Sequence, residues 1–245
     1  MKKLSITIIT KNEEKNIERC LKSVSWADEI VVLDTHSSDR TVEICRQFTD
    51  KVYDEDWQGY GRQKNICAKK ASHDWILNLD SDEEISPEGA EEIKQILSVD
   101  SEYAVYQFPR KNFFAGRWIR YGGWYPDNIS RLYNKTIVGF TESLVHEKLV
   151  PDDNVGSLGN PILHYSFLCM EDYVERQNHY STLYAEEKMK SGFQAGWSHL
   201  VLRPIASFLK NYIFRQGFRD GFQGFFLAVT FAFYTFLKYA KTRNI

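Results

Sequence analysis

The sequence predicts an α/β fold in which a mostly parallel sheet is flanked by helices. Short runs of β-branched and apolar residues alternate with stretches of helical spacing through the first hundred residues. Such alternation is typical of parallel strands joined by right-handed helical crossovers. The chain has 245 residues, 43% of them hydrophobic, which is enough for one mid-sized domain with a packed core.

The expected elements follow one another closely along the chain. In the first hundred residues, strands are expected at 4–10, 29–34, 52–53 and 75–79. Helices are expected at 16–24, from Asp39 or Thr41 to 48, at 60–71 and at 85–97. An aromatic and Gly-rich region follows, with strands expected at 104–108, 129–133 and 162–165, and then a polar helix at 170–190.

The cysteines and the N-terminus indicate the compartment. The four cysteines form no CxxC pair, and the first three fall in helix-like segments, so we expect buried free thiols in a reducing environment. The apolar run after the first lysines is too short and too β-branched for a signal peptide. Catalytic chemistry is therefore expected in the cytoplasm.

Polar clusters follow three of the expected strands, at 10–14, 34–39 and 80–82. Ligands of open parallel sheets bind beyond the carboxyl ends of the strands, so we expect these clusters to converge on one crevice. The third cluster contains Asp80-Ser81-Asp82, and two carboxylates on a tight turn are suited to share a hard divalent cation with phosphate oxygens. The alternative is a solvated turn leading into the helix that begins near Ser86-Pro87.

Four segments together resemble the family 2 glycosyltransferases with the GT-A fold. These segments are SITIITKNEEKNIERCL, EIVVLDTHSSDRTVEI, GRQKNICAKKASHDWILNLDSDE and ISRLYNKTIVGFTESLVHE. They cover about the first two-thirds of the chain. The C-terminal segment LRPIASFLKNYIFRQGFRDGFQGFFLAVTFAFYTFLKYAK is similar to the ending of a narrower group, the bacterial glucosyltransferases that modify the inner-core heptose of lipopolysaccharide.

The resemblance implies a nucleotide-sugar site with UDP-glucose as the expected donor. Thr10 and Glu13 would line the base and ribose pocket, and Asp34 would accept a hydrogen bond from the uracil ring. For Asp34 the alternative is an Asx turn or the cap of the next helix. Asp80 would reach the ribose or the sugar, and Asp82 would bind Mg²⁺ or Mn²⁺ bridging the diphosphate.

The resemblance also implies roles for the helix before the fourth strand. Arg62, Lys64 and Asn65 would lie near enough to contact the base or a phosphate. For Arg62 and Lys64 the alternative is an exposed helix face, about as well supported by the sequence.

Inverting transfer by single displacement requires a carboxylate that takes the acceptor's proton. The resemblance places Glu147 there, although His146-Glu147 stands where the family commonly has a Glu-Asp pair, and Asp127 is the second candidate base. His146 would complete the metal shell through an imidazole nitrogen, with His164 as the second choice. A single histidine is often only a structural residue, which is the alternative for both.

The last part of the chain has a different composition. We expect a nucleotide-sugar-binding catalytic domain at 1–168 and a helical, membrane-docking region at 169–245. Residues 201–245 hold seven cations and one anion, a net charge of +6 that leaves −8 on the rest, and 221–237 carries no charge. We expect peripheral attachment to the inner face of the cytoplasmic membrane. The alternative is that this run packs against the catalytic domain or a homodimer partner, and no nucleic-acid partner is expected.

The sequence thus predicts an inverting, metal-dependent glycosyltransferase that acts on a glycolipid or polysaccharide acceptor such as lipopolysaccharide core. A sugar nucleotidyltransferase is an alternative, but it would require a Gly-rich loop after the first strand, where this chain has Lys11-Asn12-Glu13-Glu14. A hydrolase with paired carboxylates is another alternative. A membrane-surface nucleotide-binding module without catalysis is the non-enzymatic alternative.

Overall fold

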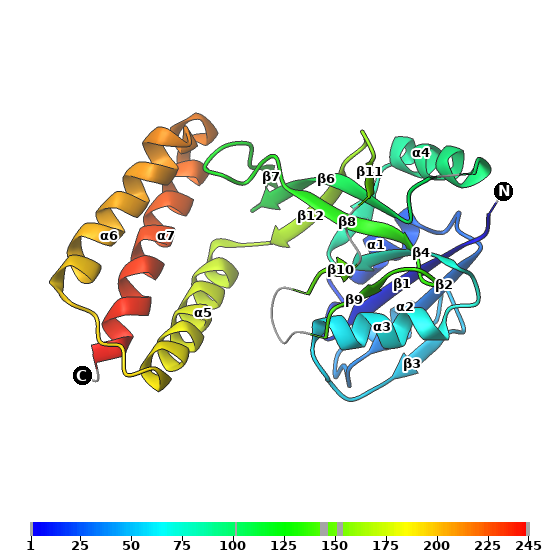
Figure 1. The fold of residues 1–245 in the computed structure, drawn as a ribbon, viewed down its shortest axis with the longest axis horizontal. Coiled ribbons are helices and arrows are strands. Elements are labelled where there is room, and N and C mark those ends of the chain that lie inside the picture. Colours follow the sequence, from blue (N-terminus) through cyan, green and yellow to red (C-terminus); the bar gives the residue numbers. More distant parts are fainter. Residues whose placement is uncertain (1, 101, 143–146, 151–153, 244–245) are drawn as a thin grey trace. The chain divides into compact units, whose positions relative to one another are not determined.

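The structure, a computed structural model, describes residues 2–100, 102–142, 147–150 and 154–243. It consists of two compact units (Figure 1). The first contains Met1–Arg110 and Asp127–His164, and the second contains Lys111–Pro126 and Tyr165–Ile245. The functional division into 1–168 and 169–245 stays a prediction.

The first unit is built on a mixed sheet with the strand order β3-β2-β1-β4-β8-β6-β12-β5. Four strands are parallel, as predicted: β1 (Leu4–Thr10), β2 (Glu29–Asp34), β3 (Val52–Asp54) and β4 (Trp75–Asp80). The next two pair antiparallel: β8 (Asn128–Asn134) and β6 (Val105–Phe114). The shorter strands are β5 (Glu83–Ile85), β9 (Gly139–Phe140), β10 (Leu149–Val150), β11 (Val155–Ser157) and β12 (Ile162–Phe167).

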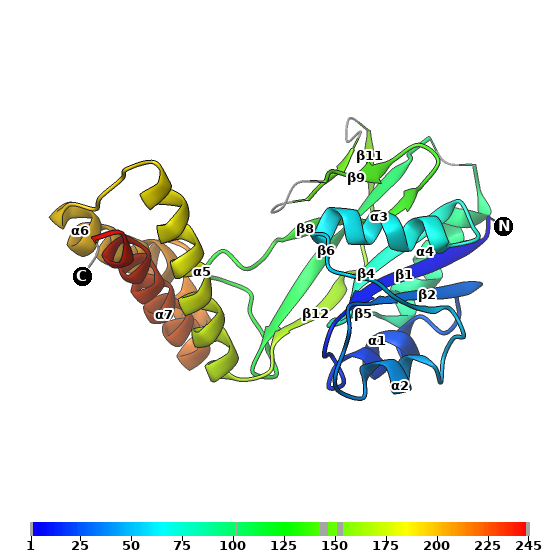
Figure 2. The same cartoon turned by 90° about the horizontal axis from the view of Figure 1, so that it is seen from below.

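Helices cover both faces of this sheet. They are α1 (Ile17–Ser23), α2 (Thr41–Cys45), α3 (Tyr60–Lys70) and α4 (Pro87–Ser98). Figure 2 shows α1 and α2 on one side of the sheet and α3 on the other. The alternation of β1 explains this layering, because Ile6 and Ile8 join the core under α1, α2 and α4, whereas Ile9 joins the core under α3.

Several boundaries differ from the prediction, most of all that of β6, which continues to Phe114 where the predicted strand ends at residue 108. Helix α2 ends at Cys45, three residues before the predicted end at Phe48. The predicted helix 85–97 begins at Pro87, because the Ser86 hydroxyl accepts a hydrogen bond from the backbone N–H of Gly89 and caps it. The preceding residues form strand β5 instead. The three cysteines of α1, α2 and α3 are buried free thiols, as predicted.

The second unit is mainly helical, and it also contains the short strand β7 (Arg117–Trp118) and the ends of β6 and β12. Its helices are α5 (Met170–Lys190), α6 (Trp197–Leu209) and α7 (Gly221–Ala240), with short helical turns η1 (Lys210–Phe214), η2 (Gly217–Asp220) and η3 (Lys241–Arg243). The sequence predicted the bounds of α5. Close packing of α7 on η2 depends on Gly224, since a Cβ there would lie 1.9 Å from the carbonyl oxygen of Gly217.

Helices α6 and α7, with the turns η1 and η2 between them, leave many large apolar side chains exposed. The exposed residues are Trp197, Val201, Leu202, Ile205, Leu209, Ile213, Phe214, Phe218, Phe222, Phe225, Val229, Phe231, Phe233 and Phe236. We call this set the apolar face. The residues that α7 buries are Gly224, Leu227, Ala228, Thr230, Thr235 and Tyr239. Residues 217–243 are also long and apolar enough to cross a membrane, although a core helix can pass the same test.

Candidate active site

The carboxyl ends of three parallel strands lie side by side in the first unit. Thr10 at the end of β1 is in register with Asp34 of β2, and Ile9 of β1 is in register with Asp80 of β4. The loops after β1 and β2 are also connected, since the backbone N–H of Asn12 donates to the Ser37 hydroxyl at 2.8 Å. The polar clusters predicted to converge therefore meet at one edge of the sheet.

The residues expected around the base and ribose lie at this edge. Thr10 is buried, and its hydroxyl has no hydrogen-bond partner among the described residues. Glu13 is half-buried and accepts a hydrogen bond of 2.9 Å from the Asn16 amide. Asp34 is buried and accepts from the backbone N–H and the hydroxyl of Ser37 at 2.7 and 2.6 Å, so its carboxylate also stabilises the local turn.

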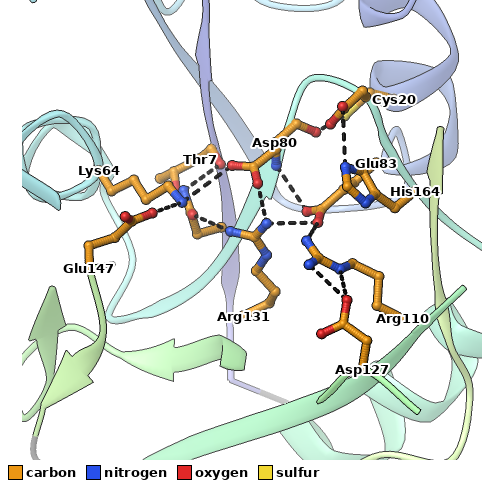
Figure 3. A network of polar contacts seen from close by, with 12 residues as sticks. Thr7, Cys20, Lys64, Asp80, Glu83, Arg110, Asp127, Arg131, Glu147 and His164 are labelled. Carbon is orange, nitrogen blue, oxygen red and sulfur yellow. Dashed lines mark hydrogen bonds and ion pairs between the residues drawn. The ribbon is translucent and has the colours of Figure 1, made fainter. Parts of the chain in front are cut away.

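Helix α3 places its two candidate cations in different environments. Arg62 is exposed, which agrees with the alternative that it lies on an exposed helix face. Lys64 has only 4% of its side chain exposed, so an exposed helix face is wrong for this residue. Its Nζ lies 3.3 Å from Asp80 Oδ1 and 2.9 Å from Glu147 Oε1. A buried ammonium therefore connects the strand-end aspartate with the first candidate base (Figure 3).

Close packing of α3 against β9 fixes this arrangement. A Cβ on Gly61 would lie 1.9 Å from the carbonyl oxygen of Thr141, so only glycine allows this approach. The Asn65 side chain holds both backbone groups of Phe140, with hydrogen bonds of 2.8 and 2.9 Å. Asn65, expected near the base or a phosphate, thus fixes the strand that leads toward Glu147.

A chain of alternating charges extends from Lys64 through the strand ends (Figure 3). The Arg131 guanidinium donates to the carboxylates of Asp80 and Glu83, with 2.7 Å to Glu83 Oε1. Arg110 continues the chain, since its Nη1 lies 3.2 Å from Glu83 Oε1 and its Nη2 lies 2.8 Å from Asp127 Oδ2. The side chains of Arg131 and Glu83 are almost completely buried. We call these residues, together with Lys64 and Glu147, the ion network.

The ion network keeps Asp80 ionised. Desolvation by the surrounding protein would raise the pKa of Asp80, but the charges of Arg131 and Lys64 outweigh it and hold this pKa well below its usual range. Two cations also occupy its oxygens, so Asp80 is a hydrogen-bond acceptor with a fixed orientation. This fits a role in orienting a sugar or ribose hydroxyl better than a role as a general base.

The second aspartate of the turn lies beside a histidine. Asp82 Oδ2 is 3.3 Å from His164 Nε2, and both side chains are less than one-fifth exposed. In the part of the chain that the structure describes, no group of three or more His, Cys, Asp or Glu side chains is placed to hold a metal ion. His146, the first choice as a histidine ligand, lies outside the described residues.

The two candidate bases have different partners. Glu147 pairs with Lys64 and keeps 18% of its side chain exposed. Asp127 is one-third exposed and accepts from Arg110 Nε at 2.9 Å as well as from Nη2. Both Arg110 contacts reach the same oxygen, Oδ2, and fix the orientation of the Asp127 carboxylate.

Comparison with known proteins identifies the family. Residues 5–148 match the family described as Glycosyl transferase family 2. The chain belongs to glycosyl transferase family 2. An uncharacterised glycosyltransferase of Rickettsia typhi is 35% identical over 257 residues, which cover 100% of this chain and 88% of that protein. The lipopolysaccharide core biosynthesis glycosyltransferase LpsC of Rhizobium meliloti is 31% identical, over 97% of this chain and 91% of LpsC.

The fold of this family 2 glycosyltransferase also has a solved counterpart. S. aureus TarS in complex with UDP-GlcNAc is similar with a TM-score of 0.50 and 15% sequence identity, over 98% of this chain and 89% of that one. The predicted GT-A fold is thereby confirmed. The family assignment makes the chain a glycosyltransferase, which argues against the nucleotidyltransferase and hydrolase alternatives.

Three residues in the ion network of this family 2 glycosyltransferase were not predicted as site residues. Arg131, Glu83 and Arg110 connect Asp80 with Asp127, yet none was selected from the sequence. A signal was present, because Arg131 lies inside an expected strand directly before Leu132, and a charge buried there must have a partner. Glu83, directly after the Asp pair, is that partner.

Proposed function

We propose that this protein transfers a sugar from a nucleotide-sugar donor, with inversion, to a glycolipid acceptor. UDP-glucose is the first donor to test, and a lipopolysaccharide core saccharide is the first acceptor. The function of LpsC in lipopolysaccharide core biosynthesis and the UDP-GlcNAc in the TarS complex support these classes. The observation that carries the proposal is the meeting of Thr10, Asp34 and Asp80 at one sheet edge.

We assign the nucleoside to the ends of β1 and β2. The Thr10 hydroxyl is buried without a partner among the described residues, as expected of a group that bonds to a ligand. Asp34 and Glu13 supply carboxylate oxygens beside it for the N–H of a pyrimidine and the hydroxyls of a ribose. Arg62, exposed on α3, is free to reach toward phosphate. Lys64 is assigned to fix Asp80 and Glu147 rather than to bind phosphate directly.

We assign a divalent metal ion to Asp82 and His164. A carboxylate oxygen and an imidazole nitrogen are ligands that Mn²⁺ accepts, and Mg²⁺ would use the carboxylate. Their 3.3 Å separation fits a shared ion, and two protein donors leave positions for diphosphate oxygens and water. When bound, the ion would neutralise the charge that grows on the departing diphosphate. His146, the earlier first choice, keeps its place as an additional candidate.

We assign the proton transfer to Glu147. The acceptor hydroxyl oxygen would form a bond to the anomeric carbon while the bond from that carbon to the diphosphate oxygen breaks. The hydroxyl proton would pass to the Glu147 carboxylate. Lys64 would hold that carboxylate directed toward the site, through the 2.9 Å contact. Asp127 is the second candidate, and its pairing with Arg110 favours a structural role.

We assign membrane attachment to the apolar face of α6 and α7, within the 169–245 region. Its large aromatic side chains are exposed, while four of the six residues that α7 buries are glycine, alanine or threonine, a distribution suited to contact with lipid. Exposed Lys210, Arg215 and Arg219 would interact with anionic headgroups. The expected location is the inner face of the cytoplasmic membrane.

A donor screen tests the function directly. UDP-, GDP- and dTDP-sugars are incubated with the protein and Mn²⁺, with and without chelator, and nucleoside diphosphate release is measured. We expect slow, metal-dependent release from a UDP-sugar, reduced at least about a hundredfold in Asp82→Asn because a stabiliser of the leaving group is lost. Release that is the same in Asp82→Asn, or absent with all donors, would contradict the proposal. Absence of release together with UDP binding would favour a module without catalysis.

A further inference from the structure

The second unit contains a cationic cavity that the glycosyl-transfer site does not use. It has a volume of about 410 Å³ and is lined by six residues, Arg117, Trp118, Arg120, Tyr121, Arg219 and Asp220. We call it the arginine pocket. All six belong to the second unit, in β7 and the residues just after it and in the turn η2.

Backbone contacts hold the two sides of the pocket together. The buried Asp220 carboxylate accepts hydrogen bonds from the backbone N–H groups of Arg120 and Tyr121, at 3.1 and 2.8 Å. The backbone N–H of Gly122 donates to the Arg215 carbonyl at 2.9 Å. Asp220 therefore has hydrogen-bond partners in the backbone, and its charge is directed to the loop.

The three arginines have no carboxylate partner among the residues that the structure describes. In the described segments, no Asp or Glu oxygen lies within ion-pair distance of Arg117, Arg120 or Arg219. Two of them instead stack on aromatic rings, Arg120 at 4.2 Å from the Trp118 centroid and Arg219 at 4.4 Å from the Tyr121 centroid. One N–H group of Arg219 donates to Gln216 Oε1 at 2.8 Å, and one of Arg117 donates to Gln223 Oε1 at 3.3 Å. Stacking fixes a guanidinium plane and leaves its other N–H groups available to an anion.

A further donor lacks a partner at the same place. The indole Nε1 of Trp118 is buried and has no hydrogen-bond partner among the described residues. Lys111 adds another positive charge, since its Nζ lies 4.6 Å from the Trp118 centroid. Buried donors are normally satisfied, so this set suggests a ligand rich in acceptor oxygens. Three guanidinium groups match the geometry and charge of a phosphate monoester.

The neighbouring residues indicate where such a phosphate comes from. Phe218 and Phe222 flank the pocket residues Arg219 and Asp220 in sequence and are 50% and 63% exposed. Both belong to the apolar face assigned to the membrane. We propose that the arginine pocket binds the phosphate monoester headgroup of a membrane lipid or glycolipid. The proposal rests on the membrane attachment proposed above and adds to it the selection of one headgroup chemistry.

Vesicle binding by the full chain tests this selection. The probes are phosphatidylcholine vesicles that contain either phosphatidic acid, a phosphate monoester, or phosphatidylserine, adjusted to the same surface potential. We expect roughly tenfold tighter binding to the phosphatidic acid vesicles, as several charge-assisted hydrogen bonds require. The double variant Arg120→Gln/Arg219→Gln should bind both vesicles equally. The matched control Lys188→Gln/Lys190→Gln removes the same charge from the end of α5 and should keep the preference.

Other results of the vesicle experiment would contradict headgroup selection by the arginine pocket. Equal binding of wild type to both vesicles, or a preference that survives in the pocket double variant, would overturn the proposal. If the protein binds inorganic phosphate in solution as tightly as it binds the vesicles, the ligand is free phosphate and the proposed lipid source is wrong. Failure to bind any vesicle would refute membrane attachment itself. Binding to both kinds of vesicle with equal affinity would refute only the headgroup selection by the pocket. Release of UDP from the donor sugar should be unchanged in the pocket variant, so its folding and its donor site are verified separately.

Discussion

His164 Nε2 lies 3.3 Å from Asp82 Oδ2, although 81 residues separate them in the chain. The antiparallel pairing of β12 with β5 brings them together, since His164 is in register with Glu83, the neighbour of Asp82. The sheet thereby adds an imidazole to the acidic turn, which creates a mixed oxygen and nitrogen donor pair.

Replacement of either donor should therefore remove metal-dependent nucleotide binding. Saturating UDP with Mn²⁺, at a hundred times Kd, should raise the free energy of unfolding of the wild type by about 2.7 kcal/mol. We expect Asp82→Asn and His164→Gln to lose most of this gain in thermal or denaturant unfolding. His179→Gln, at an exposed position on α5, is the matched control and should retain it. A full response in His164→Gln would assign the histidine a structural role only.

Glu147→Gln should separate proton transfer from donor binding. The amide keeps the size of the carboxylate but cannot take the acceptor's proton, so transfer should fall by about 10²–10⁴-fold. UDP binding, measured by calorimetry, should stay within a few-fold of wild type. Asp127→Asn, tested in parallel, should lose much less activity if Arg110 holds Asp127 structurally. The opposite ranking of the two variants would move the base to Asp127.

Arg131→Met should destabilise the first unit strongly. The change leaves the buried Glu83 carboxylate and one side of Asp80 without their cation, and breaking a buried pair in this way costs about 3–5 kcal/mol. The double variant Arg131→Met/Glu83→Gln should recover part of this loss, because it also removes a buried charge. Urea unfolding of both variants measures the coupling. A loss below about 1 kcal/mol would show that the ion network contributes little to stability.

The sequence predicted the site residues on neighbouring parallel strands, but not their partners from distant parts of the chain. The parallel strands and the meeting of Thr10, Asp34 and Asp80 followed from local patterns, because adjacent parallel strands end at the same edge. The partners of those residues did not. Arg131 and His164 reach the site through β8 and β12, whose order and register in the mixed half of the sheet are not encoded in any local pattern.

Helix α3 illustrates the same limit. The helical spacing was clear from the sequence. Because cations lie on both faces of this helix, however, the pattern did not indicate which face is buried. The packing of Gly61 on Thr141 rotates Lys64 inward, so a residue that resembled a solvated lysine is buried in the ion network.

A structural carboxylate at the opposite ends of the strands should make stability depend on pH. Burial alone would raise the pKa of Glu29, but hydrogen bonds from Lys51, Ser5 and Ser72 outweigh it and lower the pKa to about 2. A depressed folded-state pKa means that this contribution is present above the ordinary value of 4.5 and is lost as pH falls toward 2. Glu29→Gln should therefore cost roughly 3 kcal/mol at pH 7 and much less near pH 2.

Denaturant unfolding between pH 2 and 7 measures this difference. Asp28→Asn is not a suitable control because Asp28 accepts from the backbone N–H of Leu4, whereas Glu88→Gln in the first turn of α4 is exposed. A Glu29→Gln deficit that does not change with pH would show that the lost contribution is not ionic.

Membrane attachment should depend on the apolar face. Phe214 and Phe222 are 79% and 63% exposed, so replacing both by Ser removes little packing within the fold. We expect Phe214→Ser/Phe222→Ser to reduce vesicle co-sedimentation by roughly tenfold or more, given about 1.5–3 kcal/mol for each buried aromatic side chain. Val99→Ser and Ile137→Ser, at exposed positions of the first unit, are the controls. Unchanged sedimentation of the double Phe variant would contradict docking through this face.

The most direct test of the central claim is anomalous diffraction from crystals soaked with MnCl₂ and UDP. The account predicts a manganese peak in contact with Asp82 and His164, with the diphosphate on the same ion and the uridine at Thr10 and Asp34. A manganese peak elsewhere, or UDP bound away from this edge of the sheet, would contradict it.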